Sequence, residues 1–429
     1  MADDSGNDDL TGLRSYLDRS PSPHHAVAST AAALDDHGFA AVDETAGWTE
    51  LPDAGYVVRD GALIAWRTPE RVSPSGGFRL VGAHTDSPCL RLKPNPDTGA
   101  VGWRQLAVEV YGGVLNNSWL DRDLGIAGRI TTADGTSHLV AVDRPVARVP
   151  QLAIHLDRSV NDGLKLDPQQ HLQPVWGVGS GRPGEFVEWL IAETGVGAPA
   201  FWDLCLHDVQ PAALLGADRS LLASGRLDNL VSCWAATRAL VSCEPSDAIA
   251  MIVLNDHEEV GSASTTGAAG PFLEHVLERH VTARGGTRDD LLRSLSASTC
   301  VSADNAHAVH PNYPDRHEPG HRPMVNAGPA IKINSNQRYA TSSATAAAFR
   351  ASCEAVGVPH QVFVSRNNMP CGSTIGPITA SRLGIATVDV GVPQLSMHSA
   401  RELCGADDPG YLARALVHHL SATTGPLGG

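Results

Sequence analysis

The stretch AIAMIVLNDHEEVGS, from Ala248 to Ser262, joins an apolar run to two adjacent glutamates. A short β-rich apolar run of this kind predicts a buried strand, here from Ala248 to Asn255. Charges so close to a core are costly unless they are paired or bound to metal. We therefore expect Glu258 and Glu259 to have a chemical role at the carboxyl end of that strand.

A second apolar run, FRLVGA from Phe78 to Ala83, ends directly before His84. His84 belongs to the segment HTDSP, so Asp86 follows two residues later and would project to the same side of an extended chain. A metal-bound histidine needs an acceptor for its other ring nitrogen, and Asp86 is available for that role. Alone, the pair also fits an ordinary hydrogen-bonded histidine. Both polar clusters follow predicted strands, and ligands of open α/β sheets bind at the carboxyl ends of strands.

The remaining chain predicts an α/β fold with one inserted region. Strand-like segments are expected around 55–67, and the helical patterns cover Asp9 to Asp18, Pro23 to His37, Leu227 to Leu240 and Pro271 to Arg284. Between about Arg91 and Ser224 the sequence pattern changes to short stretches of alternating apolar and polar residues, broken by Gly, Asp and Pro. We predict a catalytic domain of residues 1–91 and 225–429, a β-rich domain inserted at 92–224, and a frayed tail after Thr424.

Composition narrows the class of protein. The chain has 429 residues, of which 42% are hydrophobic and 18% charged, and this is typical of a globular protein with a large core. The 47 acidic and 32 basic residues give a net charge of −15, which disfavours nucleic acid and anionic membranes as partners. The acidic start does not resemble a secretory signal, no apolar run reaches the length of a membrane span, and the eight cysteines are scattered. We expect a cytoplasmic protein.

Three further segments offer metal ligands in turns rich in Gly, Ser or Asn. They are GRLDNL with Asp228, SADNAHAVHPNY with Asp304, and LSMHSARE with His398. Each has an ordinary interpretation on its own, because Asp228 could cap a helix, Asp304 could cap a turn, and His398 could lie in an exposed loop. Likewise, two adjacent glutamates could simply begin a solvated helix.

Taken together, these segments and the two strand ends supply a complete ligand set. Two histidines and three carboxylates suit two divalent ions that share one ligand. Three carboxylates neutralise most of the charge of two such ions, as a buried site requires. One glutamate of the adjacent pair is then left to act as a base.

At these residues the chain resembles the aspartyl aminopeptidase family, metallopeptidase family 18. The resemblance runs from about Ser20 to Leu420 and rests on motifs in the family's order: HTDSP, LDNL, DHEEVGS, SADNAHAVHPNY, IKINSNQRYATS, CGSTIGP and MHSARE. It implies a zinc-dependent exopeptidase fold, with a mixed sheet flanked by helices and an inserted dimerisation domain. It also implies two Zn²⁺ ions per subunit, one held by His84 and Asp304, the other by Glu259 and His398, with Asp228 between them.

The resemblance assigns roles to further residues. Glu258 would be the general base, Asp86 would orient His84, and His155, in AIHLDR, would reach the active site of a neighbouring subunit in a tetrahedral dodecamer. Lys332 would face an acidic side chain of the substrate. Without the family, His155 and Lys332 fit an ordinary β-domain histidine and a solvated lysine.

The segment CGST allows two interpretations. It could be a loop facing the substrate, with amides near Gly372 that meet the developing oxyanion, or Ser373 or Cys371 could be a nucleophile. We favour the loop, because the metal ligands already provide for a nucleophile and no histidine–aspartate pair is assigned to Ser373.

The predicted function is hydrolysis of N-terminal residues, preferably Asp or Glu, from peptides with a free amino terminus. Because the chain is strongly acidic, selection of an acidic residue must be local, through Lys332, with Arg338 and Arg366 as further cations. The ligands also suit Co²⁺ or Mn²⁺. Alternatives are a broader metallo-aminopeptidase or deacylase acting on neutral residues, and a mainly structural, shell-forming relative.

Overall fold

The two apolar runs form neighbouring parallel strands, β4 (Phe78–His84) and β13 (Ile249–Asn255). Successive side chains of β13 point to opposite faces of the sheet, and both faces are covered: Ala250, Ile252 and Leu254 pack in one core, and Ile249, Met251 and Val253 in another. Burial on both faces explains why these strands are continuous apolar runs rather than alternating ones.

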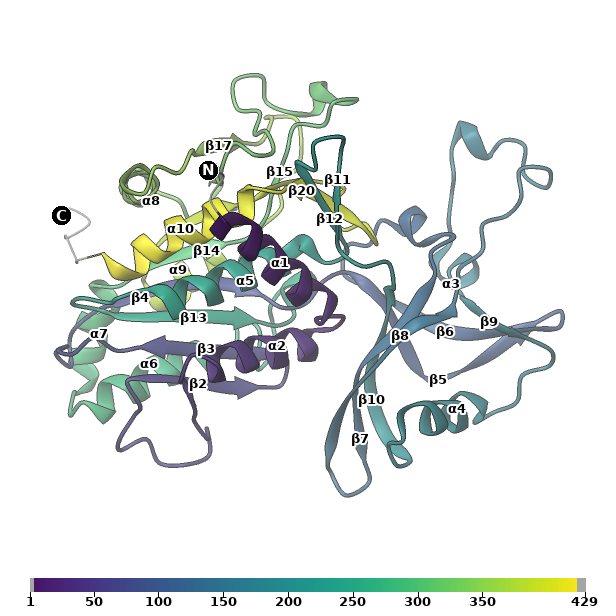
Figure 1. The fold of residues 1–429 in the computed structure, drawn as a ribbon, viewed down its shortest axis with the longest axis horizontal. Coiled ribbons are helices and arrows are strands. Elements are labelled where there is room, and N and C mark those ends of the chain that lie inside the picture. Colours follow the sequence, from purple (N-terminus) through teal and green to yellow (C-terminus); the bar gives the residue numbers. More distant parts are fainter. Residues whose placement is uncertain (1–3, 423–429) are drawn as a thin grey trace.

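These strands lie in the middle of a nine-stranded mixed sheet. The computed structural model describes residues 4–422, and its larger lobe is built on this sheet (Figure 1). The strand order is β1-β2-β3-β13-β4-β14-β18-β16-β17, and β13, β4, β14 and β18 run parallel. The other members are β1 (Ala40–Ala41), β2 (Ala54–Arg59), β3 (Ala62–Arg67), β14 (Thr299–Ala303), β16 (Ala330–Ile333), β17 (Gln361–Val364) and β18 (Ala386–Gly391).

Helices cover both faces of this sheet. One face packs against α1 (Asp4–Asp18), α2 (Pro23–Asp35), α5 (Leu227–Ser242), α8 (Ser343–Ala355) and α10 (Asp408–Ser421). On the other lie α6 (Phe272–Ala283), α7 (Arg288–Ser296) and α9 (Ile375–Leu383). The α/β fold is therefore confirmed, and the predicted helices correspond to α1, α2, α5 and α6 with ends shifted by a few residues.

The second lobe is a six-stranded antiparallel sheet formed within residues 89–208 (Figure 1). Its order is β8-β7-β10-β5-β6-β9, built from β5 (Cys89–Ala100), β6 (Trp103–Tyr111), β7 (Leu124–Thr132), β8 (Ser137–Ala147), β9 (Val175–Val178) and β10 (Pro199–Asp208). Phe186 and Leu190 of α4 (Glu185–Thr194) fill its core, and α3 (Pro168–His171) lies in the long connection between β8 and β9.

A small third sheet connects the end of this region to the C-terminal part of the chain. It contains β11 (Ala213–Leu215), β12 (Leu221–Ser224), β20 (Glu402–Gly405), β19 (Pro393–Leu395) and β15 (Ala306–His307), in that order. The pairing of β12 with β20 brings the segment before α5 next to Glu402. This pairing sets the position of Glu402, which contacts the site described below.

Two expectations remain outside these findings. The domain boundaries at 91/92 and 224/225 stay a prediction, and the tail after Thr424 lies outside the described residues. Within residues 4–422, no helix combines the length and apolar character needed to cross a bilayer.

Candidate metal centre

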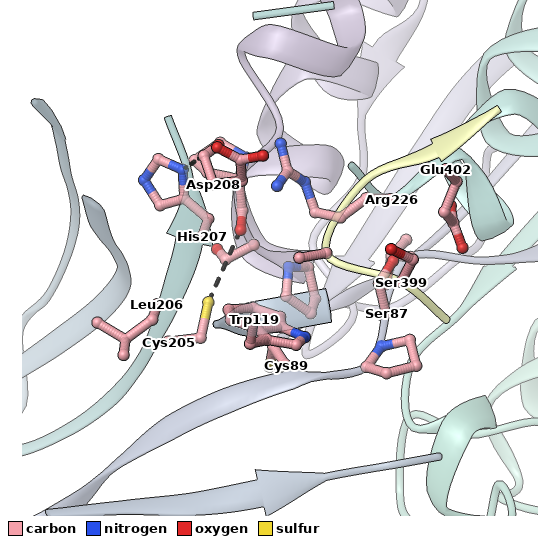
Figure 2. Close-up of a pocket in the computed structure, with 16 residues that line it drawn as sticks. Ser87, Cys89, Trp119, Cys205, Leu206, His207, Asp208, Arg226, Ser399 and Glu402 are labelled. Carbon is pink, nitrogen blue, oxygen red and sulfur yellow. Dashed lines mark hydrogen bonds between the residues drawn. The ribbon is translucent and has the colours of Figure 1, made fainter. Parts of the chain in front are cut away.

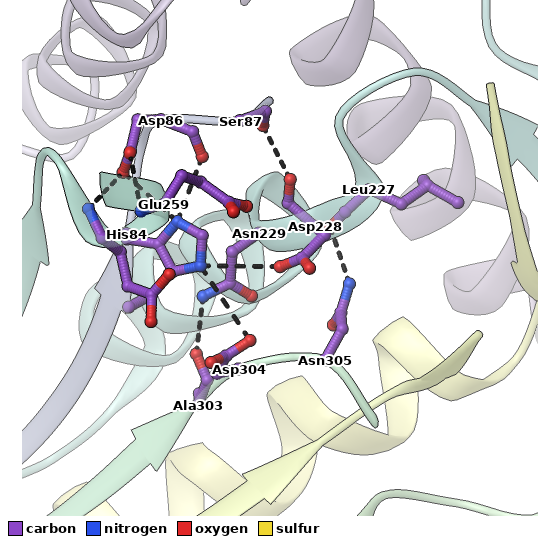
Figure 3. Close-up of polar contacts among 12 residues, drawn as sticks. His84, Asp86, Ser87, Leu227, Asp228, Asn229, Glu259, Ala303, Asp304 and Asn305 are labelled. Carbon is purple, nitrogen blue, oxygen red and sulfur yellow. Dashed lines mark hydrogen bonds and ion pairs between the residues drawn. The ribbon is translucent and has the colours of Figure 1, made fainter. Parts of the chain in front are cut away.

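Polar side chains from five segments meet at the carboxyl edge of the parallel strands, and Figure 3 labels ligands from four of them. His84 ends β4, and Glu258 and Glu259 form the short turn after β13. Asp304 directly follows β14, and Asp228 lies at the start of α5. His398 joins them from the loop before β20. The structure thus brings together every residue that the sequence predicted as a ligand, and Glu258 with them.

Three groups of three possible ligands lie close together, and two of them share Asp228: His84 with Asp228 and Asp304, and His398 with Asp228 and Glu259. The third contains His84, Glu258 and Glu259. The His84 Nε2 atom lies 3.5 Å from Asp228 Oδ1 and 3.9 Å from Asp304 Oδ1. On the other side, the His398 Nε2 atom lies 3.7 Å from Asp228 Oδ2 and 3.3 Å from Glu259 Oε2. One carboxylate therefore presents one oxygen to each histidine.

Both histidines have the ring orientation of a metal ligand. Nδ1 of His84 lies 3.0 Å from the carbonyl oxygen of Asp86, and Nδ1 of His398 lies 3.0 Å from that of Gly113. A carbonyl can only accept, so each Nδ1 carries a proton, and each Nε2 is the ring atom left to bind a cation. Each Nε2 lies 3.3–3.9 Å from carboxylate oxygens, a spacing at which nitrogen and oxygens can be ligands of one cation.

Two buried carboxylate oxygens support the same conclusion. Asp228 Oδ1 and Glu259 Oε1 are buried and have no hydrogen-bond partner. Buried charged oxygens are normally satisfied, so a positive ion is the missing partner that fits here. Ligand atoms about 2 Å from a tetrahedral zinc would lie about 3.3 Å apart, close to the spacing observed. The residues present fit zinc.

Asp228 is held through its backbone on both sides. The Ser87 hydroxyl donates to its carbonyl oxygen at 2.6 Å, and its amide donates to Glu402 Oε2 at 2.9 Å. The other oxygen of Glu402 accepts from the His398 amide at 2.7 Å. Glu402 thus positions two of the ligands, and the sequence analysis assigned it no role although it lies in the MHSARE motif.

Two asparagines tie the ligand-bearing segments together. The Asn229 side chain donates to the Ala303 carbonyl at 2.8 Å, and the Asn305 side chain donates to the Leu227 carbonyl at 2.8 Å (Figure 3). Each asparagine is the neighbour of a predicted ligand, Asp228 or Asp304. The start of α5 and the end of β14 are therefore fixed to each other next to the metal ligands.

Behind this backbone lies a small cavity between the lobes (Figure 2). Its volume is about 30 Å³, and its lining includes Ser87, Arg226 and Glu402. A water molecule needs on the order of 10–15 Å³ by this measure, so the cavity has room for about two or three waters and none for a peptide.

Asp86 is fully buried and contacts both strand ends. Its Oδ1 accepts from the Glu258 amide and its Oδ2 from the Glu259 amide, each at 3.1 Å, and Oδ1 lies 3.4 Å from His84 Nδ1. Oδ2 also accepts from the Tyr111 hydroxyl at 2.7 Å. Tyr111 comes from the second lobe, and no sequence motif pointed to it.

The electrostatics of the cluster reflect crowded negative charge. Burial raises the pKa of Glu258 to about 8, and the charges of Asp304 and Asp228 act in the same direction. Burial would also raise the pKa of Asp304, but the ammonium of Lys332 and the imidazole of His84 hold it below its ordinary value. In His84, burial lowers the pKa, but the nearby carboxylates of Asp228, Asp304 and Asp86 outweigh it, so without a bound cation its pKa lies well above the ordinary value.

Lys332 is not a solvated lysine. Its side chain is 3% exposed, and its Nζ lies 3.9 Å from Asp304 Oδ2 and 5.2 Å from the ring centre of Tyr339. It therefore lies at the edge of the cluster, and its expected contact with an acidic side chain of the substrate stays a prediction.

A cavity of about 270 Å³ opens beside the cluster, next to Tyr339. Its lining includes His307, Arg366, Gly372 and Met397, the residue before His398. Gly372 thus faces a space large enough for a side chain or two of a peptide.

Three other predicted residues lie away from the ligands. Ser373 is exposed and donates to the Arg338 carbonyl at 3.4 Å, and no histidine–aspartate pair contacts it in the described part of the chain. Arg338 is itself exposed. His155 lies on an exposed turn of the second lobe, and among residues 4–422 no hydrogen bond or ion pair joins it to the cluster.

A mixed sheet that presents histidines and carboxylates in this arrangement defines a metal-dependent hydrolase. Comparison with known proteins specifies the family: residues 16–418 match the family described as Aminopeptidase I zinc metalloprotease (M18). The chain belongs to this family and is a metallo-exopeptidase.

Individual relatives agree with this assignment. A probable M18 family aminopeptidase 2 of Streptomyces coelicolor is 57% identical over 95% of this chain and 96% of its own length. The cryo-EM structure of the Ape4 and Nbr1 complex contains a chain with a TM-score of 0.93 and 35% identity, over 97% of this chain and 86% of that one. The S. cerevisiae mApe1 dodecamer gives a TM-score of 0.82 and 29% identity, over 96% of each chain.

Proposed function

We propose that the chain is an aminopeptidase with two Zn²⁺ ions per subunit that removes N-terminal Asp or Glu from peptides. One observation carries the proposal: the two oxygens of Asp228 face different histidine–carboxylate pairs. His84 and Asp304 would hold one ion, and Glu259 and His398 the other, with Asp228 shared. Co²⁺ and Mn²⁺ would suit the same ligands.

Zinc bound there would lower the pKa of water to about 7 and polarise the scissile carbonyl. Glu258 takes the proton from the attacking water and delivers it to the leaving amine. Asp86 supports this step. It accepts hydrogen bonds from the amides of Glu258 and Glu259 and so fixes the turn that holds the base, Glu258, beside the ligand Glu259. Asp86 also orients His84 through the Nδ1 contact.

The preference for an acidic residue is supported by Lys332. Its ammonium is buried at the edge of the cluster, where its only charged neighbour within 4 Å in the described part of the chain is Asp304. A chain of net charge −15 repels acidic peptides at long range, but salt screens this beyond about 8 Å. One buried cation, Lys332, can therefore select an acidic N-terminal residue at short range.

Further roles concern the substrate and the assembly. Amides near Gly372 would meet the developing negative charge of the carbonyl oxygen, and Ser373 would belong to the same substrate-facing loop. His155 would serve the site of a neighbouring subunit, which its exposed position permits. A homo-oligomer, expected to be a tetrahedral dodecamer, is supported by the likeness to the mApe1 dodecamer.

We also propose that the enzyme works in the cytoplasm. All eight cysteines lie within residues 4–422 and are free thiols, which suits a reducing compartment.

A panel of aminoacyl anilides tests the proposal. Purified protein should cleave Asp- and Glu-anilides in preference to Leu-anilide, lose activity after treatment with a chelator, and regain it with Zn²⁺. An acetylated amino acid included in the panel separates an aminopeptidase from a deacylase. Activity that survives complete metal removal would overturn the proposed chemistry, and equal cleavage of Asp- and Leu-anilide would overturn only the specificity.

A further inference from the structure

The segment Tyr111 to Gly113, which follows β6 of the second lobe, reaches the metal centre at two points. The Tyr111 hydroxyl donates to Asp86 Oδ2 at 2.7 Å, and the Gly113 carbonyl accepts from His398 Nδ1 at 3.0 Å. Asp86 serves the side of His84, whereas His398 belongs to the other group of ligands. A segment of the second lobe therefore contacts both halves of the cluster.

The contact with Asp86 is the more informative one. A carboxylate has about four acceptor positions, and here Oδ1 faces the Glu258 amide and His84 Nδ1, while Oδ2 faces the Glu259 amide and the Tyr111 hydroxyl. Three of these partners belong to a ligand or the base. Only the fourth, Tyr111, fixes the carboxylate from outside the cluster.

The ring of Tyr111 is itself held in place. It is 7% exposed, and the Arg91 guanidinium lies 3.7 Å from the ring centre. The next residue, Gly112, lies so close to the centre that a Cβ atom there would be 3.1 Å from the Cβ of Glu259, and its φ of +74° favours glycine. The segment thus approaches the ligands closely and with one orientation.

We propose that Tyr111 is a positioning residue of the metal centre, and that the second lobe completes the centre of its own chain through it. The proposal rests on the dinuclear centre proposed above. Without the hydroxyl, Asp86 can rotate, and both the His84 ring and the turn that carries Glu258 and Glu259 lose a fixed partner.

The variant Tyr111→Phe tests this, because it removes one oxygen and keeps the ring beneath Arg91. Residues that orient metal ligands typically contribute about 10–100-fold to metal affinity. We expect the Kd of the apo-protein for Zn²⁺, measured by competition with a chromophoric chelator, to rise by about that factor. The visible absorption spectrum of the Co²⁺-loaded protein should also change, because the ligand geometry changes.

Tyr56→Phe is the matched control. The Tyr56 hydroxyl donates to Asp35 Oδ1 at 2.8 Å, and Tyr56 is also 7% exposed, but this pair lies away from the metal ligands. It should lower the thermal midpoint of the apo-protein about as much as Tyr111→Phe does, and leave the Zn²⁺ Kd and the Co²⁺ spectrum unchanged. A second variant, Arg91→Met, should shift the Co²⁺ spectrum in the same direction as Tyr111→Phe but by less.

The outcomes separate this inference from the proposed function. If the wild-type protein binds no more than one Zn²⁺ ion per chain, the dinuclear centre itself fails. If it binds two, and Tyr111→Phe has the Zn²⁺ affinity and Co²⁺ spectrum of the wild type, only the role of Tyr111 fails. The role is also rejected if Tyr56→Phe weakens metal binding equally.

Discussion

His84 and His280 lie in the same lobe and are equally buried, each with 1% of its surface exposed. His84 meets three aspartates at the carboxyl edge of the sheet. His280 lies on α6 against aromatic rings, with ring centres 4.6 Å from Trp66 and 6.1 Å from Phe78. Their pKa values move in opposite directions: burial lowers that of His280 to about 3, whereas the aspartates raise that of His84 despite burial.

The difference shows that burial of a titratable residue does not by itself indicate function. A neutral histidine between aromatic rings, such as His280, is part of a core. Its burial destabilises the fold only through one ring nitrogen, Nε2, that has no hydrogen-bond partner. A histidine among carboxylates, with two carboxylate oxygens of the cluster left without partners, requires a cation. Substitutions around His280 should therefore affect stability, and substitutions around His84 should affect activity.

The largest effect is expected for Glu258→Gln. Because this residue moves the proton, turnover should fall by roughly 10²–10⁴-fold while zinc content and thermal midpoint stay at wild-type values. Cleavage of Asp-anilide and elemental analysis measure both. The exposed variant Glu244→Gln should retain full activity. Wild-type turnover in Glu258→Gln would remove it as the base.

The next effect concerns His155, which among the described residues has no polar neighbour from the cluster. If it meets the developing oxyanion in a neighbouring subunit, His155→Ala should lower kcat by roughly 10²–10³-fold. Co-expression with Glu258→Gln should restore part of the activity, because a mixed assembly contains sites with an intact base and an intact histidine. His138→Ala, in the same lobe, is the control. Co-assembled variants with no more activity than the two separate ones would refute the role between subunits.

A smaller and selective effect is expected for Lys332→Met, which keeps most of the side-chain volume. A hydrogen bond to a charged group is worth about 1.5–3 kcal/mol, so kcat/KM for Asp-anilide should fall by roughly 10–100-fold. The loss for Leu-anilide should be much smaller. Lys165→Met, at an exposed position, is the control. Equal losses on both substrates would exclude Lys332 from the specificity pocket.

The smallest effect on turnover is expected at His280. Its pKa is about 3 in the folded protein and about 6.5 when unfolded, so the unfolded chain binds more protons between these values and stability is lost as pH falls from 6.5 towards 3. In His280→Phe the decrease in the free energy of unfolding from pH 7 to pH 5 should be smaller by about 2 kcal/mol, with activity unchanged. Denaturant titrations measure this, with exposed His37→Gln as the control. If the free energy of unfolding of His280→Phe decreased from pH 7 to pH 5 as much as that of the wild type, His280 would not be buried as a neutral group.

The parts of the molecule that could be predicted from the sequence are those with a local sequence pattern, such as an apolar run or an apolar periodicity. The strands β4 and β13 are continuous apolar runs, and His84 and the two glutamates directly follow them, so strand and ligand were found together. The helix α5 was predicted in the same way from its apolar periodicity. The alternative roles of Asp228 could be decided only in three dimensions, where its side chain faces two histidines and caps no helix.

The residues that were missed depend on contacts between distant segments. Glu402 reaches the Asp228 amide from 174 residues away, through the pairing of β12 with β20. Tyr111 reaches Asp86 from a different lobe, and in the sequence it is one aromatic residue at the end of a strand. The burial of Lys332 likewise depends on the position of β16 beside β18, which no local pattern reveals.

The central claim is that one aspartate is shared by two metal ions, and the zinc content of Asp228→Ala tests it most directly. Elemental analysis of purified protein after gel filtration should give two Zn²⁺ ions per chain for the wild type. For Asp228→Ala, with its fold checked by circular dichroism, it should give fewer than one, because both groups of ligands lose a member. Two ions retained in Asp228→Ala, or no metal bound by the wild type when Zn²⁺ is supplied, would contradict the account.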